Sequence, residues 1–295
     1  MMRKLLFYIL LITCSLTACK KEIDFDYNEI DPIVVVEGRV TNEGTEVMVT
    51  KSRSVTDSVK SHCLPGAVVT VSSADGVSER IDYDPQAQCY RSPLKGRVGE
   101  TYRLTVDFEG HHYEGTSTMP PQAPILFTEF FWFSVLDERM VVYEMWANDP
   151  EPNDRNYLWY RIDRISHHPH FTEKKLVNPY VWNVIGDRGN PPGLLFCDVY
   201  CMTERMADDD EEENWERILY EGDTITFQMM TIDRTTFDYF TSLRAGQSGG
   251  ANPWTNLTGG CQGYFTAASL SRADTLVFHY DSIRPQSTFH FDYDK

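Results

Sequence analysis

From residue 33 onward, apolar side chains recur at every second position, and this alternation restricts the chain to half-buried β-strands. The segments with this pattern are rich in Val, Thr and Tyr, which favour strands. In the first half these segments are 33–40, 46–50, 67–73, 77–83, 101–108 and 111–118. Turn sequences such as Asn42-Glu43-Gly44 and Asp75-Gly76 separate them. Short strands at this spacing predict an antiparallel Ig-like or transthyretin-like sandwich over residues 33–119.

The first run of strands ends in a proline-rich sequence, Met119-Pro120-Pro121-Gln122-Ala123-Pro124. Proline has no backbone N–H and cannot continue a strand ladder, so we place a linker at 120–125. A second antiparallel, β-rich domain is expected over 126–295. Its aromatic-rich strands are predicted at 127–133, 140–148, 157–165, 218–220, 224–232, 263–270 and 275–280.

One short helix is expected in this otherwise all-β chain, near residues 234–244. Asp233 can cap its N-terminus, and Phe237, Phe240 and Leu243 recur at helical spacing. The long stretch 166–214 contains four prolines and an acidic run, and we expect it to be rich in loops.

The N-terminus predicts a lipoprotein signal peptide over residues 1–18. Arg3 and Lys4 precede an apolar stretch that is shorter than the roughly 20 residues needed to span a bilayer. The tetrapeptide Leu16-Thr17-Ala18-Cys19 resembles the bacterial lipobox, whose cysteine receives a diacylglyceryl group. An acidic tether over 19–32 would follow. Its Lys20 favours the outer membrane, and its acidic residues favour the cell surface over the periplasm.

Five cysteines remain after Cys14 is removed with the signal and Cys19 is lipidated. In an oxidising compartment, this odd number predicts up to two disulfides and one free thiol. We expect Cys63 to pair with Cys89, and Cys261 to pair with either Cys197 or Cys201. A zinc site at Cys197 and Cys201 is disfavoured, because no second ligand pair completes it.

The net charge of −17 disfavours nucleic-acid binding, because the surface repels phosphate backbones. No serine-nucleophile motif or other assembled catalytic signature is present in the sequence, and we expect no metal and no cofactor. The sequence His167-His168-Pro169-His170 and the acidic run 208–213 are interpreted as solvated loops. The acidic loop Asp149–Asp154 has better spacing for a cation, but it lacks the closing glutamate of a calcium loop.

Several motifs in this order resemble one family. They are Val34-Val35-Val36-Glu37-Gly38, Pro65-Gly66-Ala67-Val68-Val69-Thr70-Val71, Gly99-Glu100-Thr101-Tyr102-Arg103-Leu104, Asn156-Tyr157-Leu158-Trp159-Tyr160-Arg161 and Gly260-Cys261-Gln262-Gly263-Tyr264-Phe265. The chain is similar to Bacteroidota lipoproteins catalogued as a domain of unknown function, number four thousand two hundred and forty-nine in that series. The resemblance implies an envelope protein encoded beside TonB-dependent receptors, and it supplies no catalytic residues.

We therefore expect a non-enzymatic, lipid-anchored protein that binds a partner, as an accessory to a TonB-dependent receptor system, with a glycan or peptide as a further ligand. The alternatives are a surface hydrolase acting on glycan or peptide, and an adhesive or structural surface module. Tyr180, Trp182 and Trp254 are the expected partner contacts, because they lie in loops that combine proline, polar groups and aromatic rings.

The first prediction concerns the anchor. Because the thiol of Cys19 is the expected site of lipid attachment, Cys19→Ser should block processing and release the protein from the membrane fraction. Fractionation and the mass of the mature protein measure this. An unchanged membrane fraction together with an unchanged mature mass would show that Cys19 carries no lipid.

Overall fold

Strands dominate the computed structural model, which describes residues 31–53, 62–135, 138–168, 174–177, 183–206, 218–246 and 252–289. Of the described residues, 55% lie in strands and 7% in helices, and this confirms the predicted fold class. Seven strands precede the proline-rich segment: β1 (Val34–Thr41), β2 (Thr45–Lys51), β3 (Val68–Ser73), β4 (Ser78–Asp84), β5 (Cys89–Ser92), β6 (Thr101–Phe108) and β7 (His111–Thr118).

The remaining elements follow that segment. They are β8 (Ile125–Val135), β9 (Glu138–Asn148), β10 (Tyr157–Ser166), β11 (Lys174–Val177), β12 (Asn183–Gly186), β13 (Leu194–Thr203), β14 (Ile218–Leu219), β15 (Thr224–Ile232), α3 (Arg234–Gly246), β16 (Leu257–Thr258), β17 (Gln262–Arg272), β18 (Leu276–Val277) and the 3-10 turn η2 (Tyr280–Ser282). The predicted helix is present, and the Asp233 carboxylate accepts a hydrogen bond from the Thr236 backbone N–H at 2.8 Å, as expected for its N-cap.

The sequence predicted that the stretch 166–214 is rich in loops, and the structure adds three strands within it, β11, β12 and β13. In β13 the alternate residues Leu195 and Cys197 are buried in the second core. The sequence prediction missed this strand because it relied on the neighbouring prolines.

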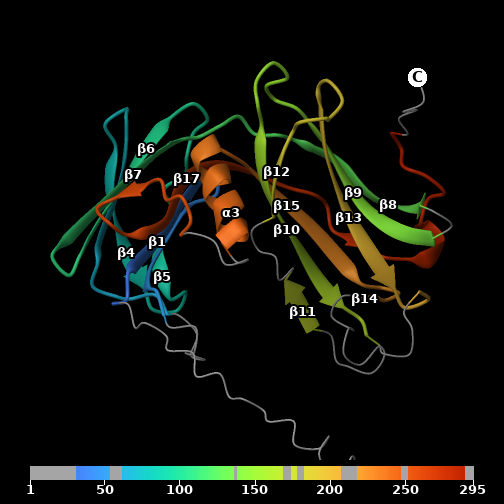
Figure 1. Ribbon diagram of the computed structural model, residues 1–295, viewed down its shortest axis with the longest axis horizontal. Coiled ribbons are helices and arrows are strands. Elements are labelled where there is room, and N and C mark those ends of the chain that lie inside the picture. The colour runs from blue at the N-terminus through green and yellow to red at the C-terminus, as the bar shows by residue number, and fades with distance from the viewer. Residues whose placement is uncertain are drawn as a thin grey trace, which may run out of the picture. The chain divides into compact units, whose positions relative to one another are not determined.

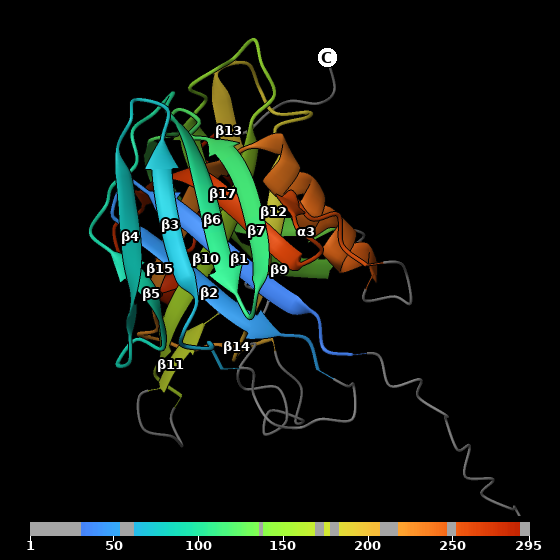
Figure 2. The same cartoon turned by 90° about the vertical axis from the view of Figure 1, so that its left-hand side faces the viewer.

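The strands form two sheets. The larger sheet has the order β11-β10-β15-β17-β1-β2-β5-β4-β3-β6-β7-β16, with β12 also paired to β10 and β18 to β15. The smaller sheet has the order β14-β13-β9-β8. Figures 1 and 2 show β17 beside β1, and α3 against the face formed by β10, β12 and β17.

Pairing between β1 and β17 is parallel and joins segments more than 200 residues apart in the chain. Phe265 of β17 is fully buried in the same core as Val36 and Leu104 from the first strands. The strands on either side of the linker predicted at 120–125 thus share one sheet and part of one core, and residues 33–295 form one compact unit.

A second core fills the space between the smaller sheet and the β10–β15 part of the larger sheet. It contains Phe130, Tyr143 and Leu195 from the smaller sheet, packed with Leu158 and Phe227 from the larger one. This is the face-to-face packing of a β-sandwich.

All five described cysteines are free, so neither predicted disulfide is present. Cys261 lies in the first core and Cys197 in the second, so a bond to Cys261 would have to cross between two separately packed interiors. Burial raises the pKa of the Cys89 thiol to about 11, and it raises the pKa of Cys63 and Cys261 as well. These thiols are therefore protonated and unreactive at neutral pH.

The second prediction tests how much the pairing of β17 with β1 contributes to the stability of the fold. Gly263 has φ +108°, and a Cβ there would lie 1.9 Å from the Val36 carbonyl oxygen. Gly263→Ala must therefore push β17 away from β1, and we expect it to lower the free energy of unfolding by more than about 3 kcal/mol.

Gly260→Ala is the matched control, because Gly260 also has positive φ (+87°) but has no atom within 4 Å of a built Cβ. It should cost only about 1 kcal/mol. Urea denaturation measures both variants. Equal losses would mean that the β1–β17 pairing contributes little to the stability of the fold.

Candidate functional site

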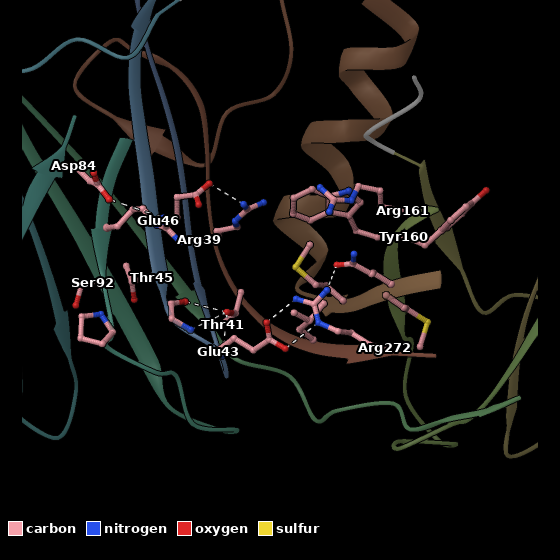
Figure 3. Close-up of a pocket in the computed structure, with 18 residues that line it drawn as sticks. Arg39, Thr41, Glu43, Thr45, Glu46, Asp84, Ser92, Tyr160, Arg161 and Arg272 are labelled. Atoms are coloured by element: carbon pink, nitrogen blue, oxygen red, sulfur yellow. Dashed lines mark hydrogen bonds and ion pairs between the residues drawn. The ribbon is translucent and has the colours of Figure 1, made fainter. Parts of the chain in front are cut away.

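A pocket of about 600 Å³ lies on the larger sheet, on the face opposite the first core (Figure 3). Its walls come from β1, β2 and β5 on one side and from β10, β15 and β17 on the other. This volume lies within the usual range for small-molecule sites. Its lining is more charged than is usual for such sites, because it includes arginines and carboxylates that belong to two rows across the strands.

The first row crosses four neighbouring strands. Arg39 of β1 is directly opposite Glu46 of β2, Glu46 is opposite Arg91 of β5, and Arg91 is opposite Asp82 of β4. Alternating charges directly opposite one another stabilise a sheet. The Arg39 guanidinium donates to the Glu46 carboxylate at 2.7 Å, whereas the nearest carboxylate oxygen to Arg91, on Asp84, is 3.9 Å away.

The second row crosses β10, β15 and β17, where Arg161, Gln228 and Arg272 are direct neighbours. Arg272 binds both carboxylate oxygens of Glu43, at 3.0 and 2.6 Å, and also donates to Gln228. Arg161 donates to Asp163 at 2.9 Å. The Gln228 amide donates to the same Asp163 oxygen at 2.7 Å.

The pair formed by Glu43 and Arg272 is ionised over the whole neutral range. The hydrogen bond from Arg272 holds the pKa of Glu43 below its usual value, and the bond to Glu43 raises the pKa of Arg272. Farther along β1, burial raises the pKa of Glu37. The pocket therefore keeps a fixed ion pair at the β1–β2 turn.

Hydrogen-bond donors outnumber their partners in this pocket. A guanidinium group has five N–H donors. Among the described residues, Arg39 and Arg161 each use one of these donors in a hydrogen bond to a carboxylate, and Arg91 has a single long contact, with Asp84. The side chains of Arg39, Arg161 and Arg91 are 33%, 39% and 56% exposed. Arg39 and Arg161 extend into the pocket from opposite sides in Figure 3. The arrangement can therefore bind a ligand rich in hydrogen-bond acceptors, such as an anion.

Of the residues predicted as partner contacts, the structure describes Trp254, which does not line this pocket. Trp254 is 69% exposed in the segment after α3, and its backbone N–H donates to the Ser242 hydroxyl at 2.8 Å. Tyr180, Trp182 and Cys19 lie outside the described residues. Sequence reasoning missed the arginine pocket, because charged residues alternate along any strand with one solvated face.

The described part of the histidine sequence and the acidic loop make contacts within the fold. His168 is buried, with its ring 4.5 Å from the ring of Tyr220, and His170 and residues 208–213 lie outside the described residues. In the acidic loop, an oxygen of Asp149 accepts hydrogen bonds from the Glu151 backbone and the Asn156 amide, which closes the loop on itself.

Over the described ranges, no group of three or more His, Cys, Asp or Glu side chains has a geometry that could hold a metal ion. Within those same ranges, no helix has the length and apolar content required to cross a membrane.

Comparison with known families matches residues 20–271 to the family described as "Domain of unknown function (DUF4249)". The match covers most of the chain and includes every residue that contributes to the two charged rows except Arg272. No curated protein matches the chain.

Proposed function

Because the chain belongs to the family described as Domain of unknown function (DUF4249), a description that assigns no activity, we propose its function from the pocket itself. We propose a non-enzymatic binding protein that holds an anionic glycan or peptide between the two charged rows. The observation that carries the proposal is the excess of guanidinium donors on Arg39, Arg161 and Arg91. Guanidinium groups match the geometry of carboxylate, sulfate and phosphate groups.

Binding accounts for this pocket better than hydrolysis does. A general acid needs a carboxyl group whose pKa is raised towards neutrality. Glu43 has the opposite shift, because Arg272 holds its pKa down. Glu144, whose pKa burial raises to about 7, is not among the residues that line the pocket and is covered by the C-terminal segment.

The cellular setting is part of the same proposal. The lipobox-like sequence ending at Cys19 and the acidic residues after it support a lipid-anchored protein of the outer membrane, exposed at the cell surface. The resemblance to lipoproteins encoded beside TonB-dependent receptors supports an accessory role in which the pocket presents ligand to such a receptor. The exposed Trp254 is then a contact for the protein partner.

The third prediction tests the ligand class by calorimetry with trigalacturonic acid, using uncharged galactotriose as the comparison. The carboxylated sugar should bind and the uncharged sugar should not. Arg39→Gln and Arg161→Gln should each weaken binding about tenfold or more, because a charged hydrogen bond contributes roughly 1.5–3 kcal/mol.

Arg103→Gln is the control, because Arg103 is also half-exposed and paired with a glutamate, Glu114, but lies outside the pocket. It should leave binding unchanged. Equal binding of the two sugars, or equal losses in all three variants, would contradict an arginine-based anion site.

The fourth prediction concerns the protein partner. In capture from native membranes in mild detergent, the wild-type protein should retain a TonB-dependent receptor, and Trp254→Ala should lose it without changing the unfolding curve. Tyr200→Ala is the control, because Tyr200 is also a large exposed aromatic residue (61%), but it lies on β13 of the smaller sheet. Full retention by Trp254→Ala would exclude this contact.

A further inference from the structure

Three carboxylates form a row across the smaller sheet, on its outer face. Glu129 of β8 is directly opposite Glu144 of β9, and Glu144 is directly opposite Asp198 of β13. Like charges in directly opposed positions destabilise a sheet. Two of these side chains are also removed from solvent, since Glu129 is 9% exposed and Glu144 is 3% exposed. The row therefore needs compensation from another part of the chain.

The compensation comes from residues 284–289, which we call the strap. The strap begins at the edge of β8, where the Arg284 N–H donates to the Phe130 carbonyl and the Arg284 carbonyl accepts from the Trp132 N–H, both at 2.9 Å. It ends with the Phe289 ring packed against the rings of Trp146 and Phe127, with ring centroids 4.6 and 5.8 Å apart. The strap thus crosses from the edge of the sheet onto its outer face.

The side chains of the acidic row accept four hydrogen bonds from the strap. The Arg284 guanidinium donates to Glu129 at 2.8 Å, and the Thr288 backbone N–H and hydroxyl both donate to Glu129 at 2.6 Å. The Ser287 hydroxyl donates to Glu144 at 2.6 Å. Arg284 is the one positive charge that the described strap brings to these three carboxylates.

Arg284 neutralises one of the three carboxylates, and a proton on the Glu144–Asp198 pair would neutralise a second. Glu144 and Asp198 are directly opposite one another on neighbouring strands, and Glu144 is only 3% exposed, so a proton on one of the two carboxyl groups removes a buried pair of like charges. Burial raises the pKa of Glu144 to about 7, with Asp198 and Glu129 adding to the shift, while hydrogen bonds from Ser287 and Trp146 oppose it. Burial also raises the pKa of Asp198.

We propose that the strap is a pH-dependent latch, which closes over the acidic row while Glu144 and Asp198 share a proton and opens when that proton is lost. Opening returns water to the row and uncovers the aromatic rings of Trp146 and Phe127. The charged groups that set the balance are Glu129 on β8, Asp198 on β13 and Arg284 in the strap itself. This inference is independent of the arginine pocket.

The direction of the pH effect follows from linkage between protonation and closure. The pKa of Glu144 is about 7 under the strap, against an ordinary value of 4.5. A group whose pKa is raised in the closed state favours closure at low pH, and this preference is lost as the pH rises from 4.5 to 7. The difference of 2.5 pKa units limits the change in the ratio of open to closed strap to about 300-fold.

The fifth prediction tests the latch by hydrogen exchange between pH 5 and pH 8, on the full chain. The protection factors of the Arg284 and Thr288 amides, corrected for the intrinsic pH dependence of exchange, should fall at least tenfold as the pH rises. Glu144→Gln keeps the side-chain shape but cannot ionise. It should keep both amides protected at pH 8 and remove most of the pH dependence.

Glu109→Gln is the matched control, because Glu109 is a half-exposed carboxylate at the turn between β6 and β7. It should behave as the wild type. If Glu144→Gln does not unfold cooperatively, Asp198→Asn removes the other member of the pair and should have the same effect. Protection that is independent of pH in the wild type, or an unchanged pH dependence in the folded variant, would overturn the proposal.

Discussion

Parallel pairing of β17 with β1 is the contact on which the rest of the structure depends. A parallel pair needs a long crossover connection, and here the crossover comprises nearly the whole chain from β2 to β16. The two strands approach so closely that Gly263 leaves no room for a Cβ beside Val36. This pairing joins the strands of the first core to β15 and β10, and so it brings together the two walls of the pocket.

The charged rows in the pocket have little value as stabilising elements. The arginine side chains of these ion pairs are a third or more exposed, and such pairs contribute only about 0–1 kcal/mol each, so stability alone gives no reason for two rows of arginines. What the rows do provide is orientation. Glu43 holds the Arg272 guanidinium in place, and Asp163 holds that of Arg161. The N–H groups of the arginines that these carboxylates do not use can donate to a ligand. This reasoning favours recognition over structural support.

The smaller sheet shows what happens when an antiparallel sheet is covered on both sides. Such a sheet usually has one solvated face. In β9, however, the residues from Val141 to Ala147 are all buried, because the second core covers one face and the strap covers the other. Glu144 lies on the face that the strap crosses, where the Ser287 hydroxyl donates to it, and burial raises its pKa. The titration of this carboxyl therefore depends on a segment more than 140 residues away in sequence.

The sequence by itself determined most of the longer strands, the helix capped by Asp233 and the all-β class, because alternation and capping are local signals that each segment carries within itself. It did not determine β13, the burial of the cysteines or the two charged rows of the pocket. It also did not determine that Glu129, Glu144 and Asp198 lie directly opposite one another on neighbouring strands. Those features depend on which strands become neighbours and in what register. Register is a property of pairs of distant segments, so only the tertiary structure decided them.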